Sequence, residues 1–287
     1  MVAQGSNSIL RPPPLKRFQL SKPTKESLEW ANLIELDISR FDESPQARKE
    51  LASTLLESLH NTGFLFIVNH GVDETTLSYE IPKNGSTDGR YSGFAPQSYR
   101  SSTIYENNVE HYNFSRFTSE IGDQQNPDFP TSLRPYLRDV EAMSKYIHKD
   151  LARRLFILIA IALDVEHTTF ADMHIYEAKS DSFMRYMQYL PRTHRENEAS
   201  QDLYLPGHAD WGSLTFLFNQ PISALQIKDQ NNEWKWVKYI PNSIVVNVGI
   251  ALSALTGGYL KPTIHRVVKP PKDQADAPRL SLLYFIR

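Results

Sequence analysis

Two kinds of hydrophobic pattern divide the chain. Over residues 132–165 apolar positions recur at helical intervals, which predicts one long amphipathic helix. From residue 182 onward the pattern changes to about eight short runs rich in β-branched and aromatic residues, separated by turn-forming segments. This spacing is typical of a jelly roll. We therefore predict a mainly β fold with flanking helices, a double-stranded β-helix with the long helix packed behind it.

The chain before the long helix has a different organisation. Residues 1–30 are a lead-in that carries several Pro and Lys residues, and residues 31–72 predict a strand, a helix and a strand. Residues 73–131 hold clusters of Gly, Ser, Asn and Pro, which predict largely irregular structure. We expect residues 1–120 to form an N-terminal domain that packs as one compact unit with the long helix and β core of residues 121–287.

Composition excludes several classes of function. A chain of 287 residues with 40% hydrophobic residues can bury a full core. Its 31 basic and 33 acidic residues leave no basic stripe for nucleic acid. The sequence shows neither a secretion signal nor a run of apolar residues long enough for a membrane span, so we expect a cytoplasmic protein without a membrane partner. The absence of Cys fits that compartment and leaves His and carboxylates as the metal ligands.

Three residues of the β region form the pattern of a metal site. His208 and Asp210 are two residues apart at the head of an apolar run, so in extended backbone their side chains point to the same face. His265 opens a second strand-like run. Two imidazoles and one carboxylate on one face of an octahedral ion leave positions open for a co-substrate and O2. This is the ligand set of non-haem Fe(II) oxygenases.

Two other pairs of His and carboxylate are weaker candidates. His148 and Asp150 have the same spacing, but they lie in the predicted helix, where side chains two apart do not face each other. We expect His148 to be a solvated or locally bonded helix residue. His194 and Glu196 lie in a polar run, residues 191–202, that predicts a loop.

A further pattern follows His265 along the chain. Residues 278–286 predict a strand whose alternation places Arg279 and Ser281 on one face. The guanidinium of an Arg binds a carboxylate through two parallel hydrogen bonds, and the Ser hydroxyl adds another donor. Alone, such a pair is usually a surface feature. Behind a complete set of metal ligands it predicts a clamp for the carboxylate of a co-substrate.

These motifs resemble the iron(II)- and 2-oxoglutarate-dependent oxygenase superfamily, in particular the branch that includes isopenicillin N synthase and plant flavonoid oxygenases. Within the β region the resemblance rests on residues 207–218, 242–252, 257–268 and 279–285. In the N-terminal half, residues 34–39 and 47–72 are similar to the strand, helix and strand of that branch, and residues 184–192 are similar to fungal members.

The resemblance implies a non-haem iron dioxygenase. It implies that His208, Asp210 and His265 bind Fe(II). It also implies that Arg279 and Ser281 hold the far carboxylate of 2-oxoglutarate, with O2 as the other co-substrate. The reaction it implies is oxidation of an aliphatic C–H of a small organic metabolite, by hydroxylation, desaturation or ring closure, in specialised metabolism.

One departure from the family pattern concerns the co-substrate. Relatives carry a Tyr directly before the Pro that follows the strand at 182–190, and here that position is Leu190. By strand alternation we expect Tyr189 to point to the other face, and Tyr186 to contribute to the clamp. Leu190 also keeps a second hypothesis open, an oxidase of the isopenicillin N synthase type in which Arg279 binds the substrate's own carboxylate and no 2-oxoglutarate is used. A catalytically silent metal-binding protein is the third hypothesis.

Aromatic residues suggest where a substrate binds. Trp211 follows Asp210 directly, so we expect it near the metal and in the substrate pocket. Tyr112 and Phe114 belong to a segment that resembles the one crossing the barrel mouth in relatives, and we assign them to the same pocket. Relatives also carry a further helix before the position of Tyr91 and another after the last strand. Either this member is shorter at those places or the given sequence omits the segments, and we favour the second alternative.

Overall fold

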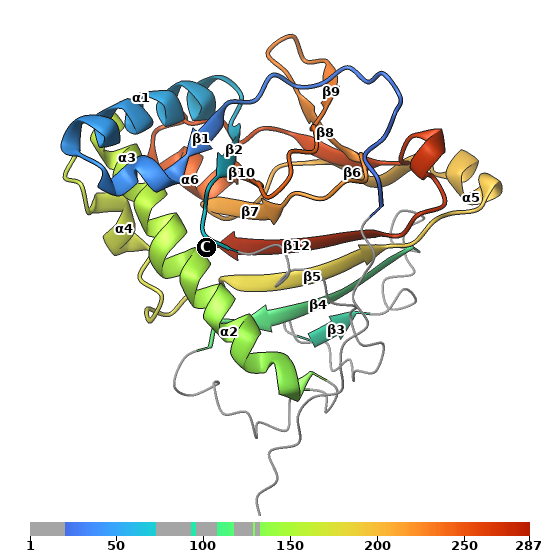
Figure 1. The fold of residues 1–287 in the computed structure, drawn as a ribbon, viewed down its shortest axis with the longest axis horizontal. Helices are drawn as coiled ribbons and strands as arrows, with labels where there is room; N and C mark the ends of the chain where they lie inside the picture. Colours follow the sequence, from blue (N-terminus) through green and yellow to red (C-terminus); the bar gives the residue numbers. More distant parts are fainter. Residues whose placement is uncertain (1–20, 73–92, 96–107, 118–128, 130–132) are drawn as a thin grey trace, which may run out of the picture.

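Two β-sheets form the body of the molecule (Figure 1). The computed structural model describes residues 21–72, 93–95, 108–117, 129 and 133–287. The interval after residue 72, where the sequence predicts an omitted helix, lies outside the described residues. Within the described part, no helix is both long and apolar enough to cross a membrane.

The larger sheet has eight strands in the order β1-β2-β10-β7-β12-β5-β4-β3, and the smaller sheet has four in the order β6-β11-β8-β9. The strands of the larger sheet are β1 (Glu35–Asp37), β2 (Phe64–Val68), β3 (Gly93–Ala95), β4 (Val109–Ser115), β5 (Phe183–Tyr189), β7 (Leu214–Phe218), β10 (Ile244–Val248) and β12 (Arg279–Ile286). Those of the smaller sheet are β6 (Leu203–His208), β8 (Leu225–Lys228), β9 (Trp234–Trp236) and β11 (His265–Val268). The eight strands β5 to β12 confirm the predicted double-stranded β-helix.

Six α-helices flank the sheets in the described part of the chain: α1 (Pro45–Asn61), α2 (Leu137–Tyr146), α3 (Arg153–Ala162), α4 (Thr169–Met173), α5 (His194–Ala199) and α6 (Ile250–Leu255). Short 3-10 turns lie at Ile38–Asp42, Arg134–Tyr136 and Lys272–Gln274. Helix α1 starts sharply because the Ser44 hydroxyl accepts the backbone N–H of Ala47 and Pro45 occupies the first turn.

The predicted long helix is present as α2 and α3 joined by a π-helical turn, Ile147–Ala152. Its apolar side chains belong to the same buried cluster as Phe216 and Tyr284 of the larger sheet, so the helix covers one face of that sheet. Strand β12 shows how the two faces differ. Its even-numbered residues from Leu282 to Ile286 join this cluster, whereas the odd-numbered ones line a pocket on the opposite face.

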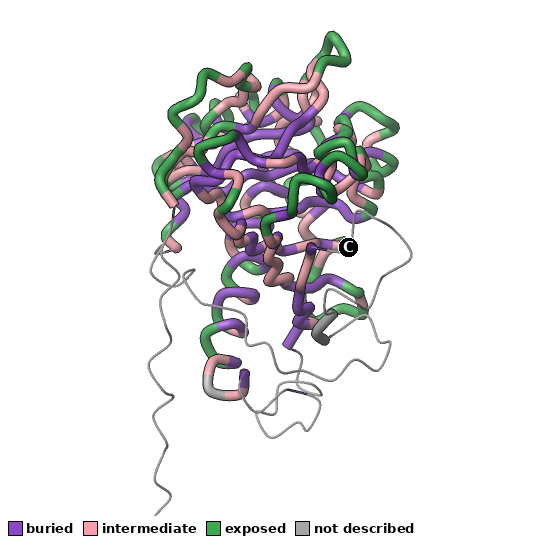
Figure 2. Tube along the Cα trace, turned by 90° about the vertical axis from the view of Figure 1, so that its right-hand side faces the viewer, coloured by how far each residue is buried: buried purple, intermediate pink, exposed green. Residues whose placement is uncertain are grey.

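The main buried cluster takes residues from both predicted parts of the chain, with Leu55 of α1, Leu158 of α3 and Phe216 of β7 among them. Strand β2 also pairs directly with β10 of the β core. Figure 2 shows the buried residues gathered at the centre of the molecule and the exposed ones on the outer loops. The two predicted parts of the chain therefore share one buried core.

Two local predictions are wrong. The predicted loop at 191–202 contains α5, because Thr193 and Glu196 form a capping box in which each side chain bonds the other's backbone N–H. His148 is neither solvated nor locally bonded. It is 4% exposed, and its ring nitrogens bond the Tyr284 hydroxyl at 3.0 Å and the His174 carbonyl at 2.7 Å.

Candidate active site

The two sheets enclose a pocket with a volume of about 360 Å³. Its walls come from β5, β7, β10 and β12 of the larger sheet and from β6, β8 and β11 of the smaller one. All three residues of the predicted metal site line this pocket, as do Arg279 and Ser281. The structure therefore brings together in one cavity five residues from three separate segments of the sequence.

His208, Asp210 and His265 come together because β6 and β11 are antiparallel neighbours in which His265 pairs with His208. The Nε2 atoms of His208 and His265 lie 3.7 Å and 3.9 Å from Oδ1 of Asp210. One ligand atom from each of the three residues lies within 4.8 Å of the other two, and this is the one such cluster among the described residues. The donor set and its spacing fit a divalent iron ion with open positions.

Hydrogen bonds orient both imidazoles. Nδ1 of His208 lies 3.0 Å from the Pro206 carbonyl oxygen, and Nδ1 of His265 lies 3.3 Å from the Thr263 carbonyl oxygen. A carbonyl accepts, so each Nδ1 carries the proton and donates it, and the Nε2 lone pair points to the cluster. Burial lowers the pKa of the His265 ring by more than Asp210 raises it, which favours the neutral form that binds a metal.

Asp210 is held by two neighbours on the larger sheet. Its Oδ2 accepts hydrogen bonds from Thr215 Oγ1 at 2.7 Å and Asn247 Nδ2 at 2.8 Å, while Oδ1 faces the two histidines. Burial raises the pKa of this carboxyl, but electrostatic interaction with the neighbouring imidazoles and the two hydrogen bonds outweigh burial and lower the pKa below its usual value. The carboxylate is thus ionised and fixed in orientation.

Arg279 lies at another part of the pocket, 5% exposed. Its Nη1 donates to Ser281 Oγ at 2.6 Å, and its Nε is buried without a hydrogen-bond partner among the described residues. No carboxylate of the described chain forms an ion pair with it, and burial lowers the pKa of the guanidinium. A buried cation in this state is costly, so the site fits an anionic ligand that supplies the missing acceptors.

Comparison with known proteins shows that the β core is similar to one superfamily. Residues 179–287 match the family model described as the 2OG-Fe(II) oxygenase superfamily. The β core of the chain resembles this superfamily. It is 28% identical over 268 residues to gibberellin 2-beta-dioxygenase 4 of Arabidopsis thaliana, covering 88% of this chain and 80% of the relative. It is 27% identical over 284 residues to scopoletin 8-hydroxylase of the same plant, covering 93% of this chain and 74% of the relative.

Solved structures agree in fold. The crystal structure of a full-length Neurospora crassa protein in complex with alpha-KG superposes with a TM-score of 0.72 at 21% identity, covering 94% of this chain and 89% of that one. The family match, the named relatives and the metal-ligand cluster support an iron-dependent dioxygenase, with Fe(II) as cofactor and 2-oxoglutarate and O2 as co-substrates.

The register of this oxygenase's sheet corrects one site prediction. Arg279 pairs directly with Tyr189 across β12 and β5, so these two side chains share the pocket face, and the guanidinium carbon lies 5.7 Å from the Tyr189 ring centroid. Tyr186 pairs with Leu282 and packs against the main core on the opposite face. The prediction that Tyr186 joins the clamp is wrong on this geometry, because β5 ends at Tyr189 and the alternation does not extend to Leu190.

Of the three aromatic residues assigned to the substrate pocket, one lines the pocket and two lie in the core. Trp211 lines the pocket of the oxygenase and is 75% exposed, as expected for a residue at its entrance. Tyr112 and Phe114 are each 4% exposed and belong to the main core on the helix-covered face of the sheet. Their assignment to the substrate pocket is wrong, because β4 pairs with β5 in a register that turns them toward the core.

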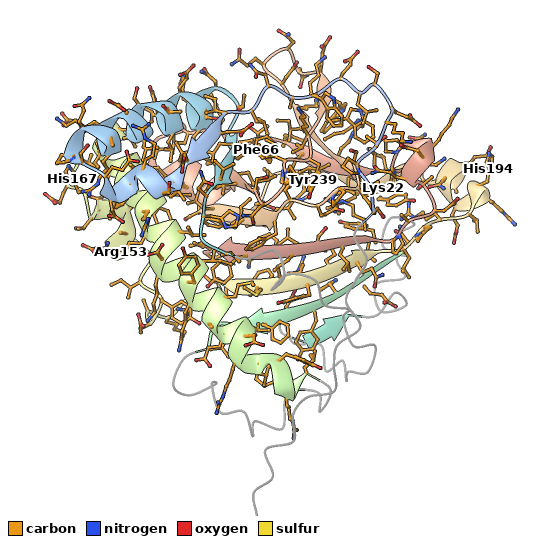
Figure 3. All side chains as sticks on the ribbon, viewed as in Figure 1. Lys22, Phe66, Arg153, His167, His194 and Tyr239 are labelled. Carbon is orange, nitrogen blue, oxygen red and sulfur yellow. The ribbon has the colours of Figure 1, made fainter. Side chains whose placement is uncertain are left out.

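The alternative pair also lies elsewhere. His194 is on α5 at the edge of the molecule (Figure 3), and its Nδ1 lies 3.4 Å from an Oε2 of Glu198. Tyr189, Thr215 and Asn247 belong to the site and were not predicted from the sequence. Thr215 and Asn247 were detectable, since each is a lone polar residue inside an otherwise apolar strand, where burial demands a partner.

Proposed function

We propose that this oxygenase oxidises an aliphatic C–H of a small organic metabolite, and that His208, Asp210 and His265 hold the Fe(II). The observation that supports this most strongly is the cluster itself. Three neutral or anionic ligand atoms lie within 4.8 Å of one another in a pocket that also contains a buried arginine. The relatives named gibberellin 2-beta-dioxygenase 4 and scopoletin 8-hydroxylase support a small organic metabolite as the substrate.

We assign the co-substrate clamp to Arg279, Ser281 and Tyr189. The buried guanidinium needs acceptors, the Ser281 hydroxyl holds it in place at 2.6 Å, and the Tyr189 side chain stands directly opposite on β5. A carboxylate bound here receives two parallel N–H donors. The clamp thus fixes one end of 2-oxoglutarate, and the histidines and Asp210 face its keto-acid end.

When bound, Fe(II) with 2-oxoglutarate and O2 supplies the oxidising power, with release of succinate and CO2. The chain's own residues prepare this chemistry. Asn247 and Thr215 keep Asp210 ionised and immobile, and the backbone carbonyls at 206 and 263 fix the ring tautomers. His208, His265, Thr215 and Asn247 stand on strands, and the hydrogen bonds from Thr215 and Asn247 hold Asp210, which lies between β6 and β7, so movement of the ligand set is limited.

The oxidase hypothesis without 2-oxoglutarate is not favoured. It rested on Leu190 in place of a tyrosine, and Tyr189 stands across from Arg279 in its stead. We also propose that the chain belongs to the isopenicillin N synthase-like branch, on the similarity of residues 34–39, 47–72 and 184–192. The cytoplasmic location and the division at residue 120 remain proposals that rest on the sequence.

Arg279→Ala tests the clamp. Removing one partner of a buried charge pair costs about 2–5 kcal/mol, so the dissociation constant of 2-oxoglutarate should rise by at least about 30-fold. Binding is measured by calorimetry on protein loaded with Mn(II), which prevents turnover. Affinity for Mn(II) alone should remain close to wild type. Equal loss of both affinities would show that Arg279 supports the fold and does not bind the co-substrate.

A further inference from the structure

The connection between β6 and β7 carries the metal ligand Asp210 and passes close to the start of helix α6. Residues 209–213 cross here from the smaller sheet to the larger one, so Asp210 lies between two strands and not on either of them. Gly249 lies between β10 and α6. Gly249 and Gly212 of the connection are both buried, so any displacement at this place must be taken up by neighbouring backbone.

Backbone hydrogen bonds join the connection to the first turn of α6. The Ile250 N–H donates to the Asp210 carbonyl oxygen at 2.7 Å, and the Ala251 N–H donates to the Gly212 carbonyl oxygen at 3.1 Å. The first N–H groups of a helix have no partner within the helix, and a side chain at the preceding position usually accepts one of them. Gly249 occupies that position and has no side chain, so the carbonyls of the connection accept these bonds instead.

Gly249 makes this close approach possible. A Cβ atom at position 249 would lie 2.0 Å from the Gly212 carbonyl oxygen and 3.0 Å from the Asp210 carbonyl oxygen. The backbone of Gly249, with φ −97° and ψ 174°, has an extended conformation that any residue adopts, so the requirement for glycine here is one of space. To lengthen the first of these contacts from 2.0 to 3.0 Å, the connection and the helix would have to separate by about 1 Å.

The segment from Asn247 to Ile250 holds Asp210 through both its side chain and its backbone. Asn247 Nδ2 donates to the carboxylate Oδ2 at 2.8 Å, and the Ile250 N–H donates to the backbone carbonyl. The other carboxylate oxygen, Oδ1, lies 3.7 Å and 3.9 Å from the Nε2 atoms of the two histidines. Distances between a metal and its ligands vary by only about 0.2 Å, so a displacement of the Asp210 backbone by about 1 Å is large for this site.

We propose that Gly249 is a positioning residue for the metal site. Its lack of a side chain lets the start of α6 fix the backbone of Asp210 at the place where the carboxylate faces the two histidines. This inference rests on the proposed function, and it adds a residue that acts on the metal through the backbone of a ligand.

The first test adds a methyl group at the contact. In Gly249→Ala the dissociation constant of Mn(II), measured by calorimetry on metal-free protein, should rise by about 10- to 100-fold, the usual effect of disturbing the support of a metal ligand. Gly71→Ala is the matched control. Its φ of 78° strains any side chain, and among the described residues its Cβ would meet only Tyr146, far from the ligand set in sequence. It should lose stability in urea and keep the Mn(II) dissociation constant within about threefold.

Ile250 supplies a second pair of variants. Ile250→Pro removes the N–H that donates to Asp210, and the helix start is kept because Pro is well accommodated in the first turn. Ile250→Ala keeps this N–H and removes a side chain that is 37% exposed. The Pro variant should weaken Mn(II) binding as Gly249→Ala does, and the Ala variant should bind Mn(II) as the wild type does.

Folded Gly249→Ala or Ile250→Pro with the wild-type affinity for Mn(II) would overturn the proposal. If neither variant folds, hydrogen exchange in the wild type decides. Because linked equilibria are reciprocal, Mn(II) should slow exchange of the amides at 250 and 251 by about fivefold or more, and unchanged rates would overturn the proposal. A wild type that binds no Mn(II) would refute the proposed function itself, whereas equal binding by wild type and variants would refute only the role of Gly249.

Discussion

Thr215→Val removes one hydroxyl from the support of the metal ligands and leaves the shape of the site unchanged. Thr215 Oγ1 donates to Oδ2 of Asp210 at 2.7 Å, and Val has nearly the same volume as Thr. The Thr215 side chain lies on β7 and is 3% exposed, and a Val of nearly equal volume opens no cavity there. The change should therefore act through the orientation and charge of Asp210.

The magnitude follows from the burial of the bond. A hydrogen bond to a charged group contributes about 1.5–3 kcal/mol. Because the Asp210 side chain is only 11% exposed, water cannot readily take the place of the lost Thr215 hydroxyl as a donor. Asn247 still donates to the same oxygen at 2.8 Å and retains part of the orientation. We expect affinity for Fe(II) to fall by about 10- to 100-fold, the usual effect of losing a group that supports a metal ligand.

The assay is competition for Fe(II) against a coloured chelator under anaerobic conditions. Thr256→Val, in which the lost hydroxyl bonds backbone carbonyls at the end of α6, is the matched control and should bind Fe(II) as the wild type does. Once saturated with metal, Thr215→Val should bind 2-oxoglutarate normally. Wild-type affinity for Fe(II) in Thr215→Val would refute the claim that this hydrogen bond prepares the ligand.

Two further predictions concern neighbouring features. Tyr189→Phe should raise the dissociation constant of 2-oxoglutarate by about tenfold, because one hydrogen bond to a charged group is lost. Tyr186→Phe should leave this constant unchanged. A rise in Tyr186→Phe and none in Tyr189→Phe would mean that the register at Arg279 is misassigned. Burial lowers the pKa of His148 from 6.5 to about 4, so the unfolded chain takes up this proton first as the pH falls. The contribution of His148 should lower the free energy of unfolding by up to about 3 kcal/mol as the pH falls from 6.5 to 4. Urea denaturation of the metal-free protein measures this fall, and it should be smaller by that amount in His148→Gln.

The metal ligands could be predicted because their chemistry depends on local spacing. His208 and Asp210 are two residues apart in one extended segment, and this alone fixes a common face. His265 required only that a second strand lie beside the first, which the antiparallel pairing of β6 and β11 provides. Arg279 and Ser281 follow the same rule on β12.

The residues that were misassigned depend on register or on partners distant in sequence. Which face of β5 carries Tyr186 or Tyr189 is decided by the pairing with β12, and alternation counted from Leu190 starts outside the strand. Tyr112 illustrates the same limit on β4. His148 depends on Tyr284, 136 residues away, to satisfy its ring nitrogen, and no local pattern records such a partner.

We infer that the pocket binds Fe(II) through His208, Asp210 and His265, with 2-oxoglutarate beside the metal. The most direct measurement is an anaerobic titration of the Fe(II)-loaded protein with 2-oxoglutarate, followed by the visible charge-transfer band that Fe(II) gives with a chelating 2-oxo acid. We predict that the band appears and saturates in the wild type and is absent in His208→Ala. A wild-type protein that binds Fe(II) and gives no band at saturating 2-oxoglutarate would show that 2-oxoglutarate does not bind the metal in this pocket.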